Sequence, residues 1–215
     1  MKYKPIFFYS EDDKAYVAMY PELPGCMADG ETIHEALVNL EEAAEGWLQV
    51  YSERGKGEPI SIDDMKKEST NPSSEDVAGY ILKKTGKIST YALQKYLYYC
   101  QAWSYGWSGE PLFDGEFQAW VDGPVNPEVY QLYKGRYMAS DKDIPLTDHV
   151  FSEYEKRLMD LVLSVYEDFT GDELSTMSHI EEPWIKSRAG KEPDERGNAS
   201  IEPKDLIEYF GMRAL

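Results

Sequence analysis

The sequence predicts an α+β protein, in which a small N-terminal sheet with one packed helix precedes a mainly α-helical domain with a short β-hairpin. Aromatic and β-branched runs separated by turn residues fill the first thirty positions, a pattern typical of strands. Further along, apolar residues recur at helical spacing, and the helical stretches begin at capping residues. The 215 residues, 42% of them hydrophobic, suffice for one large domain or two small ones and exclude a disordered chain.

The predicted strands lie near the N-terminus. Residues 3–10 and 15–20 predict a hairpin, with an acidic turn between its strands. Residues 21–25, which include two prolines and a glycine, must form a turn, and residues 26–28 are expected to add a short third strand. After the helix, residues 59–62 are expected to form a further strand, so the predicted order of elements is ββ(β)αβ.

One helix is expected between these strands. Thr32 and Glu35 have the spacing of a capping box, in which the hydroxyl accepts a hydrogen bond from a first-turn amide. An apolar stripe follows at helical spacing, and Gly55 ends it. Residues 1–62 are therefore expected to form the first domain. Residues 63–75 lack apolar periodicity and collect Ser, Thr, Asn and Pro, which predicts a linker.

The second domain, residues 76–215, is expected to be mainly helical. Ser89 or Thr90 caps a predicted long helix that runs to Gly106. Asn126 precedes a proline, which indicates another helix start. The other expected elements are a short helix from Val77 to Gly86, a hairpin over 112–121 around Asp114 and Gly115, and helices over 126–137, 152–171, 174–180, 184–189 and 203–210.

Charge and cysteine content narrow the functional classes. The formal net charge of −18 opposes binding to phosphate backbones, so direct nucleic-acid binding is not expected. A basic protein partner fits better, because opposite net charges raise encounter rates. Cys26 and Cys100 lie far apart, which favours two free thiols in a reducing cytosol. No signal peptide or membrane span is recognisable, so we expect a soluble cytoplasmic protein without cofactor or metal.

The first domain carries a specific motif of proline and glycine residues. Its characteristic residues are Tyr3, Pro5, Tyr16-Val17-Ala18, Pro21-Glu22-Leu23-Pro24-Gly25-Cys26, Gly30, Thr32, Glu35 and Ala36. With these residues, about sixty positions resemble the HicB antitoxin family. The resemblance implies a partial ribonuclease-H-like sheet that lacks nuclease carboxylates and that binds and blocks a small RNA-cleaving toxin. It also implies self-association, so a homodimer through this domain is one expectation.

The second domain carries a longer motif. Its residues are Ile88-Ser89, Leu93-Gln94-Lys95-Tyr96-Leu97-Tyr98-Tyr99, Gly109, Pro111-Leu112-Phe113, Ala119-Trp120, Gly123-Pro124-Val125, Pro127, Val129-Tyr130, Leu174-Ser175, His179, Glu181 and Pro183-Trp184. Over about residues 76–211 this pattern resembles the SocA-type antitoxin domain, also called the Panacea domain. The resemblance implies neutralisation of a toxin by direct contact. One branch of that family instead tethers its toxin to a protease.

The helix predicted from Thr90 to Gly106 carries aromatic residues on two faces. Its expected core face consists of Leu93, Tyr96, Leu97, Cys100, Trp103 and, just beyond it, Trp107. Tyr91, Tyr98 and Tyr105 lie seven residues apart on the other side. Tyrosines offer a large rigid contact area with a polar tip, which suits a protein interface. A helix buried on both sides by a large domain explains the pattern equally well, so both interpretations stay open.

Two alternative functions, DNA binding and catalysis, fit the sequence less well. Residues 76–106 have the length of a DNA-reading helix-turn-helix, but the second helix begins with Tyr, Ala and Leu rather than with base-contacting side chains. His179, Glu181 and Trp184 form the only cluster that resembles a reactive site. A metal needs three or four ligands, and neither a nucleophile elbow nor a phosphate-binding glycine loop is present. We therefore expect no enzymatic activity.

The sequence thus predicts an antitoxin of a bacterial or phage toxin–antitoxin system that binds a cognate protein toxin directly. The toxin is expected to be basic or membrane-active. The alternatives are a proteolysis adaptor, a transcriptional regulator of its own operon, and a hydrolase. The residues expected to contact the toxin are Tyr91, Gln94, Lys95, Tyr98, Tyr99, Trp120 and Trp184.

Overall fold

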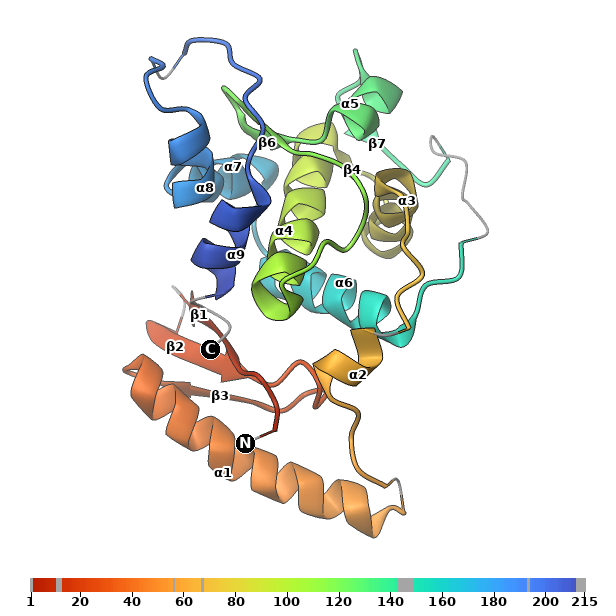
Figure 1. The fold of residues 1–215 in the computed structure, drawn as a ribbon, viewed down its shortest axis with the longest axis vertical. Coiled ribbons are helices and arrows are strands. Elements are labelled where there is room, and N and C mark those ends of the chain that lie inside the picture. The colour runs from red at the N-terminus through yellow and green to blue at the C-terminus, as the bar shows by residue number, and fades with distance from the viewer. Residues whose placement is uncertain are drawn as a thin grey trace.

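The computed structural model describes residues 2–10, 13–55, 57–66, 68–142, 149–192 and 194–211. A three-stranded sheet with one long helix is followed by a mostly helical region with short two-stranded ladders, which confirms the predicted fold class (Figure 1). Helix α4, Thr90–Ser108, runs through the middle of the helical region. Helices α3, α6, α7 and α9 pack around it.

The N-terminal sheet is antiparallel with the strand order β1–β2–β3. β1 covers Ile6–Ser10, β2 covers Ala15–Met19 and β3 covers Met27–Gly30. Ile6 pairs with Met19 in the first ladder, and Met19 pairs with Met27 in the second. The predicted hairpin and the predicted short third strand are therefore both present.

The prediction of a strand over residues 59–62 is wrong. Helix α2, Ile62–Lys66, begins inside that segment. The carbonyl oxygen of Ser61 accepts a hydrogen bond from the amide of Met65, which closes a helical turn instead of a strand pair. Pro59 has no amide hydrogen to donate to a neighbouring strand.

Helix α1, Ile33–Glu53, follows the sheet and packs along it. The Thr32 hydroxyl caps it by accepting from the amide of Glu35 at 3.1 Å, as predicted, although the Glu35 carboxylate accepts from the amide before Thr32. A Cβ on Gly30 would lie 2.5 Å from the amide nitrogen of Ala36. Glycine at this position therefore allows the helix to approach the last strand closely.

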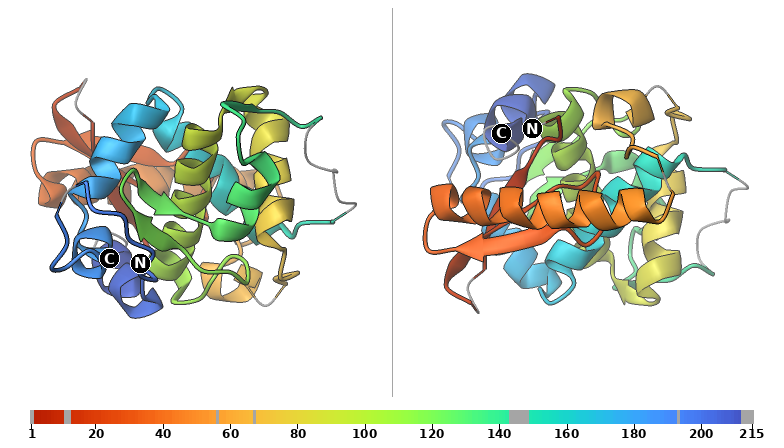
Figure 2. Two further views of the ribbon diagram at one scale, coloured as in Figure 1. Left: turned by 90° about the horizontal axis from the view of Figure 1, so that it is seen from above. Right: turned by 90° about the horizontal axis from the view of Figure 1, so that it is seen from below.

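The sheet is covered on both faces (Figures 1 and 2). On one face, Phe7 and Ala18 share an apolar cluster with Leu40 of α1. On the other, Ile6 and Met19 belong to the large core of the helical region. α2, which lies in the segment predicted as a linker, adds its buried Ile62 and Met65 to that core: the two parts of the chain share apolar contacts. The predicted boundaries of two domains stay a prediction.

The helical region contains short strands between its helices. Its elements besides α4 are α3 Ser74–Thr85, β4 Ile88–Ser89, β5 Gln118–Trp120, β6 Gly123–Val125, α5 Pro127–Tyr133, β7 Met138–Ala139, α6 Glu153–Tyr166, α7 Gly171–His179, α8 Glu182–Ser187 and α9 Pro203–Gly211. β4 pairs with β7, and β5 pairs with β6, both in antiparallel fashion.

Helix starts follow the predicted caps, whereas helix ends differ. The side chains of Ser89, Asn126 and Ser152 each accept a hydrogen bond from a first-turn amide of the helix that follows. The helix after Asn126 ends at Tyr133 rather than Tyr137, and the helix after Ser152 ends before Gly171. Gly171 instead opens α7, because Thr170 provides a separate cap there.

The hairpin predicted around Asp114 and Gly115 lies further along the chain. β5 and β6 turn at Val121 and Asp122 instead. The earlier backbone has other partners: the Gln101 side chain of α4 accepts from the amides of Leu112 and Phe113 and donates to the Phe113 carbonyl oxygen. These bonds replace the strand pairing that the sequence pattern indicated.

Candidate functional site

Four of the seven residues predicted to contact a toxin line one cavity, here called the Lys95 pocket. Tyr91, Gln94 and Lys95 come from the first two turns of α4, and Trp120 is the last residue of β5. The volume of the cavity is about 220 Å³. Its other lining residues come from the start of α4, from the β5–β6 hairpin and from α5 with the segment after it: Thr90, Asp122, Val125, Tyr130, Tyr133, Gly135 and Arg136.

Lys95 is the most unusual residue of this pocket, because its side chain is only 1% exposed. Its Nζ donates a hydrogen bond to the Pro124 carbonyl oxygen at 3.2 Å and lies 5.1 Å from the centre of the Tyr91 ring. Burial lowers the pKa of Lys95 to about 7, and the negative charge of Asp122 opposes this shift. The interior position therefore disfavours the charged ammonium.

Gly123 explains how the hairpin can pass so close to Lys95. A Cβ at this position would lie 2.6 Å from the Lys95 Nζ, and the backbone φ of Gly123 is 100°. Residues with a side chain rarely adopt this backbone conformation. Both the limited space and the backbone geometry therefore favour glycine.

Gln94 holds the opposite side of the hairpin. Its Oε1 accepts from the amide of Asn126 at 2.7 Å, and its Nε2 donates to the carbonyl oxygen of the same residue at 3.3 Å. Asn126 Oδ1 in turn caps α5 by accepting from the amide of Val129 at 2.9 Å. Gln94 thus aligns α4, the hairpin and α5, and its amide is already occupied by these bonds.

Trp120 and Trp184 are linked, although Trp184 does not line the pocket. The Trp184 Nε1 donates to the Trp120 carbonyl oxygen at 3.1 Å. The Trp120 ring meets Tyr130 edge to face at a centroid distance of 4.8 Å. Both indoles are partly exposed, and the hydrogen bond between them joins α8 to the last residue of β5.

Tyr98 and Tyr99 lie in the core rather than on the surface. Both side chains are 0% exposed. The Tyr98 hydroxyl donates to Glu181 Oε2 at 3.2 Å, and the Tyr99 hydroxyl donates to Oε1 of the same carboxylate at 3.1 Å. Tyr99 also stacks on Tyr166 at 4.2 Å. Of the two interpretations of α4, burial on both sides fits this part of the helix. The toxin-contact role of these two residues stays a prediction, and their position offers no direct surface for it.

Glu181 and His179 have different neighbours. Glu181 is buried and accepts from two tyrosines, as described above. His179 packs against Trp184 at a centroid distance of 4.3 Å, and its buried Nε2 has no hydrogen-bond partner among the described residues. Burial lowers the pKa of His179, and the positive charge of Lys95 lowers it further. In the part of the chain that the structure describes, no three His, Cys, Asp or Glu side chains gather as metal ligands.

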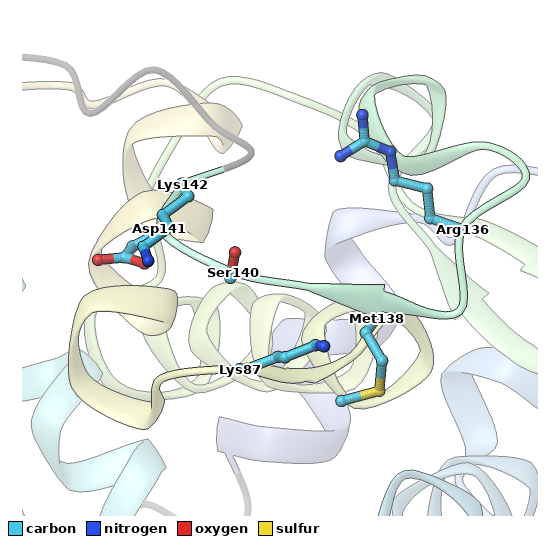
Figure 3. A pocket seen from close by; sticks show the side chains of 6 residues that line it. All are labelled: Lys87, Arg136, Met138, Ser140, Asp141 and Lys142. Atoms are coloured by element: carbon cyan, nitrogen blue, oxygen red, sulfur yellow. The ribbon is translucent and has the colours of Figure 1, made fainter.

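A second, wider hollow adjoins the Lys95 pocket and has a volume of about 620 Å³. Figure 3 shows Lys87 and Met138 close together at one wall, with Arg136 and Asp141 at opposite ends. Arg136 lines both cavities. The hollow is open and its charged side chains are of both signs, so it defines no specific ligand.

Sequence reasoning missed the residues that α5 brings to the pocket. Tyr130 and Tyr133 are three residues apart, which places them on one face of a helix, and this spacing was the available signal. Arg136 lies after the helix, where the chain turns back towards α4, and no sequence pattern indicated its position.

Two family matches divide the chain between them. Residues 93–185 match the family described as Antitoxin SocA-like, Panacea domain. Residues 4–84 match the family described as HicB_like antitoxin of bacterial toxin-antitoxin system. Most residues that line the Lys95 pocket fall within the first of these matches.

Two individual relatives are also similar to the chain. Antitoxin SocA from Caulobacter vibrioides is 40% identical over 70 residues, which are 29% of this chain and 37% of that protein. A UPF0150 protein from Thermoplasma acidophilum is 39% identical over 49 residues, which are 23% of this chain and 70% of that protein. The chain therefore spans little more than a third of the length of the SocA relative. No solved structure matches the chain at a significant level.

The family matches identify antitoxin domains of toxin–antitoxin systems in both parts of the chain. In this chain, a part that matches the HicB-like antitoxin family is followed by a part that matches the SocA-like Panacea domain. This finding confirms both resemblances noted in the sequence. Among the described helices, none has the length and apolar character that crossing a membrane requires.

Proposed function

We propose that this chain neutralises a cognate protein toxin by binding it directly, through the face that surrounds the Lys95 pocket. The observation that carries the proposal is the convergence of Tyr91, Lys95 and Trp120. These residues come from two separate segments of the Panacea-like part and lie around one cavity. A concave site with aromatic walls and a charged group is a common form of recognition site.

The rim of the pocket suits a protein interface. Tyr91, Trp120 and Tyr130 are partly exposed, and Arg136 is exposed beside them. Tyrosine, tryptophan and arginine are the residue types that contribute most to binding energy in protein interfaces. The contact between Trp120 and Tyr130 holds two of these rings in place before any partner binds. A preformed rim loses little conformational freedom on binding, which favours affinity.

Charge supports a basic toxin as the partner. The net charge of −18 creates a long-range attraction for a positively charged protein and raises its association rate. This steering acts before contact and is weakened by salt. The aromatic rim would then provide the short-range contacts, so charge and rim act at different stages of binding.

The HicB-like part has a separate role in the proposal. Its sheet is covered on both faces, and the edge strands β1 and β3 are where another strand can add. Self-association through this part, which the HicB resemblance implies, stays a prediction. Sedimentation of the purified chain at several concentrations would test it.

Growth rescue in cells tests the proposed function. The product of the reading frame next to this gene is expressed with the wild-type chain, with Trp120→Ala or with Tyr9→Ala. Tyr9 is a partly exposed aromatic residue of β1, far from the pocket in the chain, and serves as the matched control. We expect the wild type and Tyr9→Ala to restore growth and Trp120→Ala to fail, at equal amounts of folded antitoxin.

The fate of the toxin distinguishes occlusion from delivery to a protease. Direct neutralisation predicts that the toxin accumulates in a stoichiometric complex with the antitoxin. Rescue accompanied by loss of the toxin would instead support a proteolysis adaptor. Full rescue by Trp120→Ala would show that toxin binding uses another face of the molecule.

A further inference from the structure

Lys95 is a buried cationic group with an incomplete set of partners. An ammonium has three N–H donors. Among the described residues, the Pro124 carbonyl oxygen is the one hydrogen-bond acceptor of Lys95 Nζ. The nearby Tyr91 ring offers only its π face, at 5.1 Å. The side chain also lines the Lys95 pocket, so an acceptor that enters this cavity can complete the hydrogen bonding of the ammonium.

The charged groups around Lys95 leave the pocket short of negative charge. Asp122, in the β5–β6 turn, is the carboxylate that acts on Lys95, and its own side chain is exposed. Arg136 lines the same cavity from the segment after α5, and His179 of α7 lies within electrostatic range of Lys95. Burial raises the pKa of Tyr91 on α4 to about 12, so its hydroxyl is uncharged at neutral pH. Among the described groups that line the cavity, two can be cationic, Lys95 and Arg136, and one is a carboxylate, Asp122, so the lining favours an anion.

The size of the cavity limits what can enter. Ligand pockets for drug-sized molecules span roughly 300–1,000 Å³, whereas the Lys95 pocket has about 220 Å³. This space suits a single amino-acid side chain or the last residue of a chain. The walls of Tyr91, Trp120 and Tyr130 are aromatic, so an occupant with an apolar body and an anionic tip matches both parts of the pocket.

We propose that the Lys95 pocket binds one carboxylate-bearing residue of the partner polypeptide, with the carboxylate on Lys95 Nζ and the apolar part against the aromatic walls. The carboxylate comes either from an Asp or Glu side chain or from a chain terminus. The proposal deepens the proposed function, because it names the group on the partner that the pocket recognises. It rests on that function only for the identity of the partner.

Proton linkage follows from the same geometry. A bound carboxylate stabilises the ammonium form of Lys95, whose pKa burial lowers to about 7 in the free chain. Above that pH the chain must take up a proton when it binds the carboxylate. The affinity for the carboxylate therefore falls with rising pH, by up to about tenfold per pH unit above 7. A neutral ligand shows no such dependence.

The test uses short synthetic peptides and the full-length chain. The first probe is an acetylated tetrapeptide of three glycines and a terminal phenylalanine with a free carboxylate. The second is the same peptide with a C-terminal amide, and the third is an amidated peptide with an internal aspartate before phenylalanine. Isothermal titration calorimetry measures binding of each probe at pH 6.5 and pH 8.5, and in buffers of different ionisation enthalpy at the higher pH.

We expect one of the two carboxylate probes to bind with a stoichiometry of one. The neutral amide should bind at least about tenfold more weakly, as expected for loss of a charge-assisted hydrogen bond. The terminal carboxylate and the internal aspartate report the two sources separately. Binding at pH 8.5 should be weaker than at pH 6.5 and should take up a proton from the buffer.

Lys95→Met and Lys87→Met form a matched pair of variants. Methionine is unbranched like lysine, one heavy atom shorter, and tolerates burial, so Lys95→Met is expected to fold, and its thermal midpoint verifies this. Lys87 is exposed and lines the neighbouring hollow instead. Carboxylate binding should be lost in Lys95→Met and unchanged in Lys87→Met.

Three results would overturn the proposal. These are equal affinity for the carboxylate and the amide, no binding of either carboxylate probe, and unchanged binding by folded Lys95→Met. The probes contain no toxin, so a negative result here leaves the growth-rescue test intact. Conversely, a failed growth rescue with intact probe binding would contradict the proposed neutralisation of the toxin but would leave carboxylate binding in the Lys95 pocket supported.

Discussion

The first turns of helix α4 and its middle use the same residue types for different purposes. In its first turns, Tyr91 and Lys95 line a cavity that opens towards solvent. One to two turns later, Tyr98 and Tyr99 are fully buried and share the carboxylate of Glu181. The contrast shows that aromatic residues at helical spacing indicate a helix but do not tell which face is an interface. The elements packed around each turn decide that.

The largest expected effect concerns the buried middle of α4. Tyr98→Ala should lower the free energy of unfolding by about 3–5 kcal/mol, because the ring packs against Tyr99, Phe117 and Phe210. Chemical denaturation measures the loss. Tyr98→Phe keeps the ring and removes only the hydroxyl donor, so it should cost about 1–2 kcal/mol. A Tyr98→Ala chain that stays as stable as the wild type but no longer binds toxin would restore the interface interpretation.

Lys95→Met, in the first turns of the helix, should change the free energy of unfolding in the opposite direction. Removal of a buried ammonium with few partners is expected to raise the free energy of unfolding at pH 7 by about 1–3 kcal/mol. The advantage should shrink between pH 7 and pH 10. Over that range the unfolded chain holds more protons at Lys95 than the folded chain, whose Lys95 pKa is about 7, so the wild type gains stability. Chemical denaturation at pH 7 and pH 9 measures this. If the free energy of unfolding changes by the same amount between these pH values in the wild type and in Lys95→Met, Lys95 is not a buried, titrating group.

A smaller effect is expected where the connecting segment meets α6. The buried Glu155 carboxylate accepts from the Thr70 amide, the Thr70 hydroxyl and the Ser152 amide, each at 2.7 Å. Burial alone would raise the pKa of Glu155, but these hydrogen bonds outweigh it and lower the pKa. The stabilisation is therefore complete above the unfolded value of about 4.3 and is lost as pH falls through the lower folded value.

Glu155→Gln tests this contact. The substitution should cost about 1–2 kcal/mol at pH 7, and the difference from the wild type should shrink in acid. Unfolding curves at pH 7 and pH 3 provide the measurement. A difference that is independent of pH would mean that the charge of this carboxylate does not stabilise the fold.

The smallest effect on stability belongs to Tyr91→Ala. Tyr91 is partly exposed, so its loss should cost about 1 kcal/mol or less in the free energy of unfolding. Its effect on toxin affinity should be larger than its effect on stability, whereas Tyr98→Ala should show the reverse. Equal ratios of the two effects at both positions would remove the distinction between the first turns of α4 and its middle.

Local signals were predictable from the sequence, and contacts between distant segments were not. The caps at Thr32, Ser89, Asn126 and Ser152 depend on side chains within three residues of the amide that they bind, so spacing alone revealed them. The hairpin was placed too early because Gln101, from another element, binds the backbone that looked ready for strand pairing.

The candidate site shows the same division. Tyr91, Gln94 and Lys95 share one helix face and could be chosen together from helical spacing. Arg136 reaches the pocket only because the chain after α5 turns back towards α4, and β7 pairs there with β4. Such placement depends on tertiary packing, which residue spacing does not encode.

The most direct test of the central claim is the affinity of the purified full-length chain for its purified toxin, measured by isothermal titration calorimetry. Binding through the Lys95 face predicts a defined stoichiometry, with Trp120→Ala at least about tenfold weaker and Tyr9→Ala unchanged. A toxin that does not bind the chain, or that binds folded Trp120→Ala as tightly as the wild type, would contradict the account.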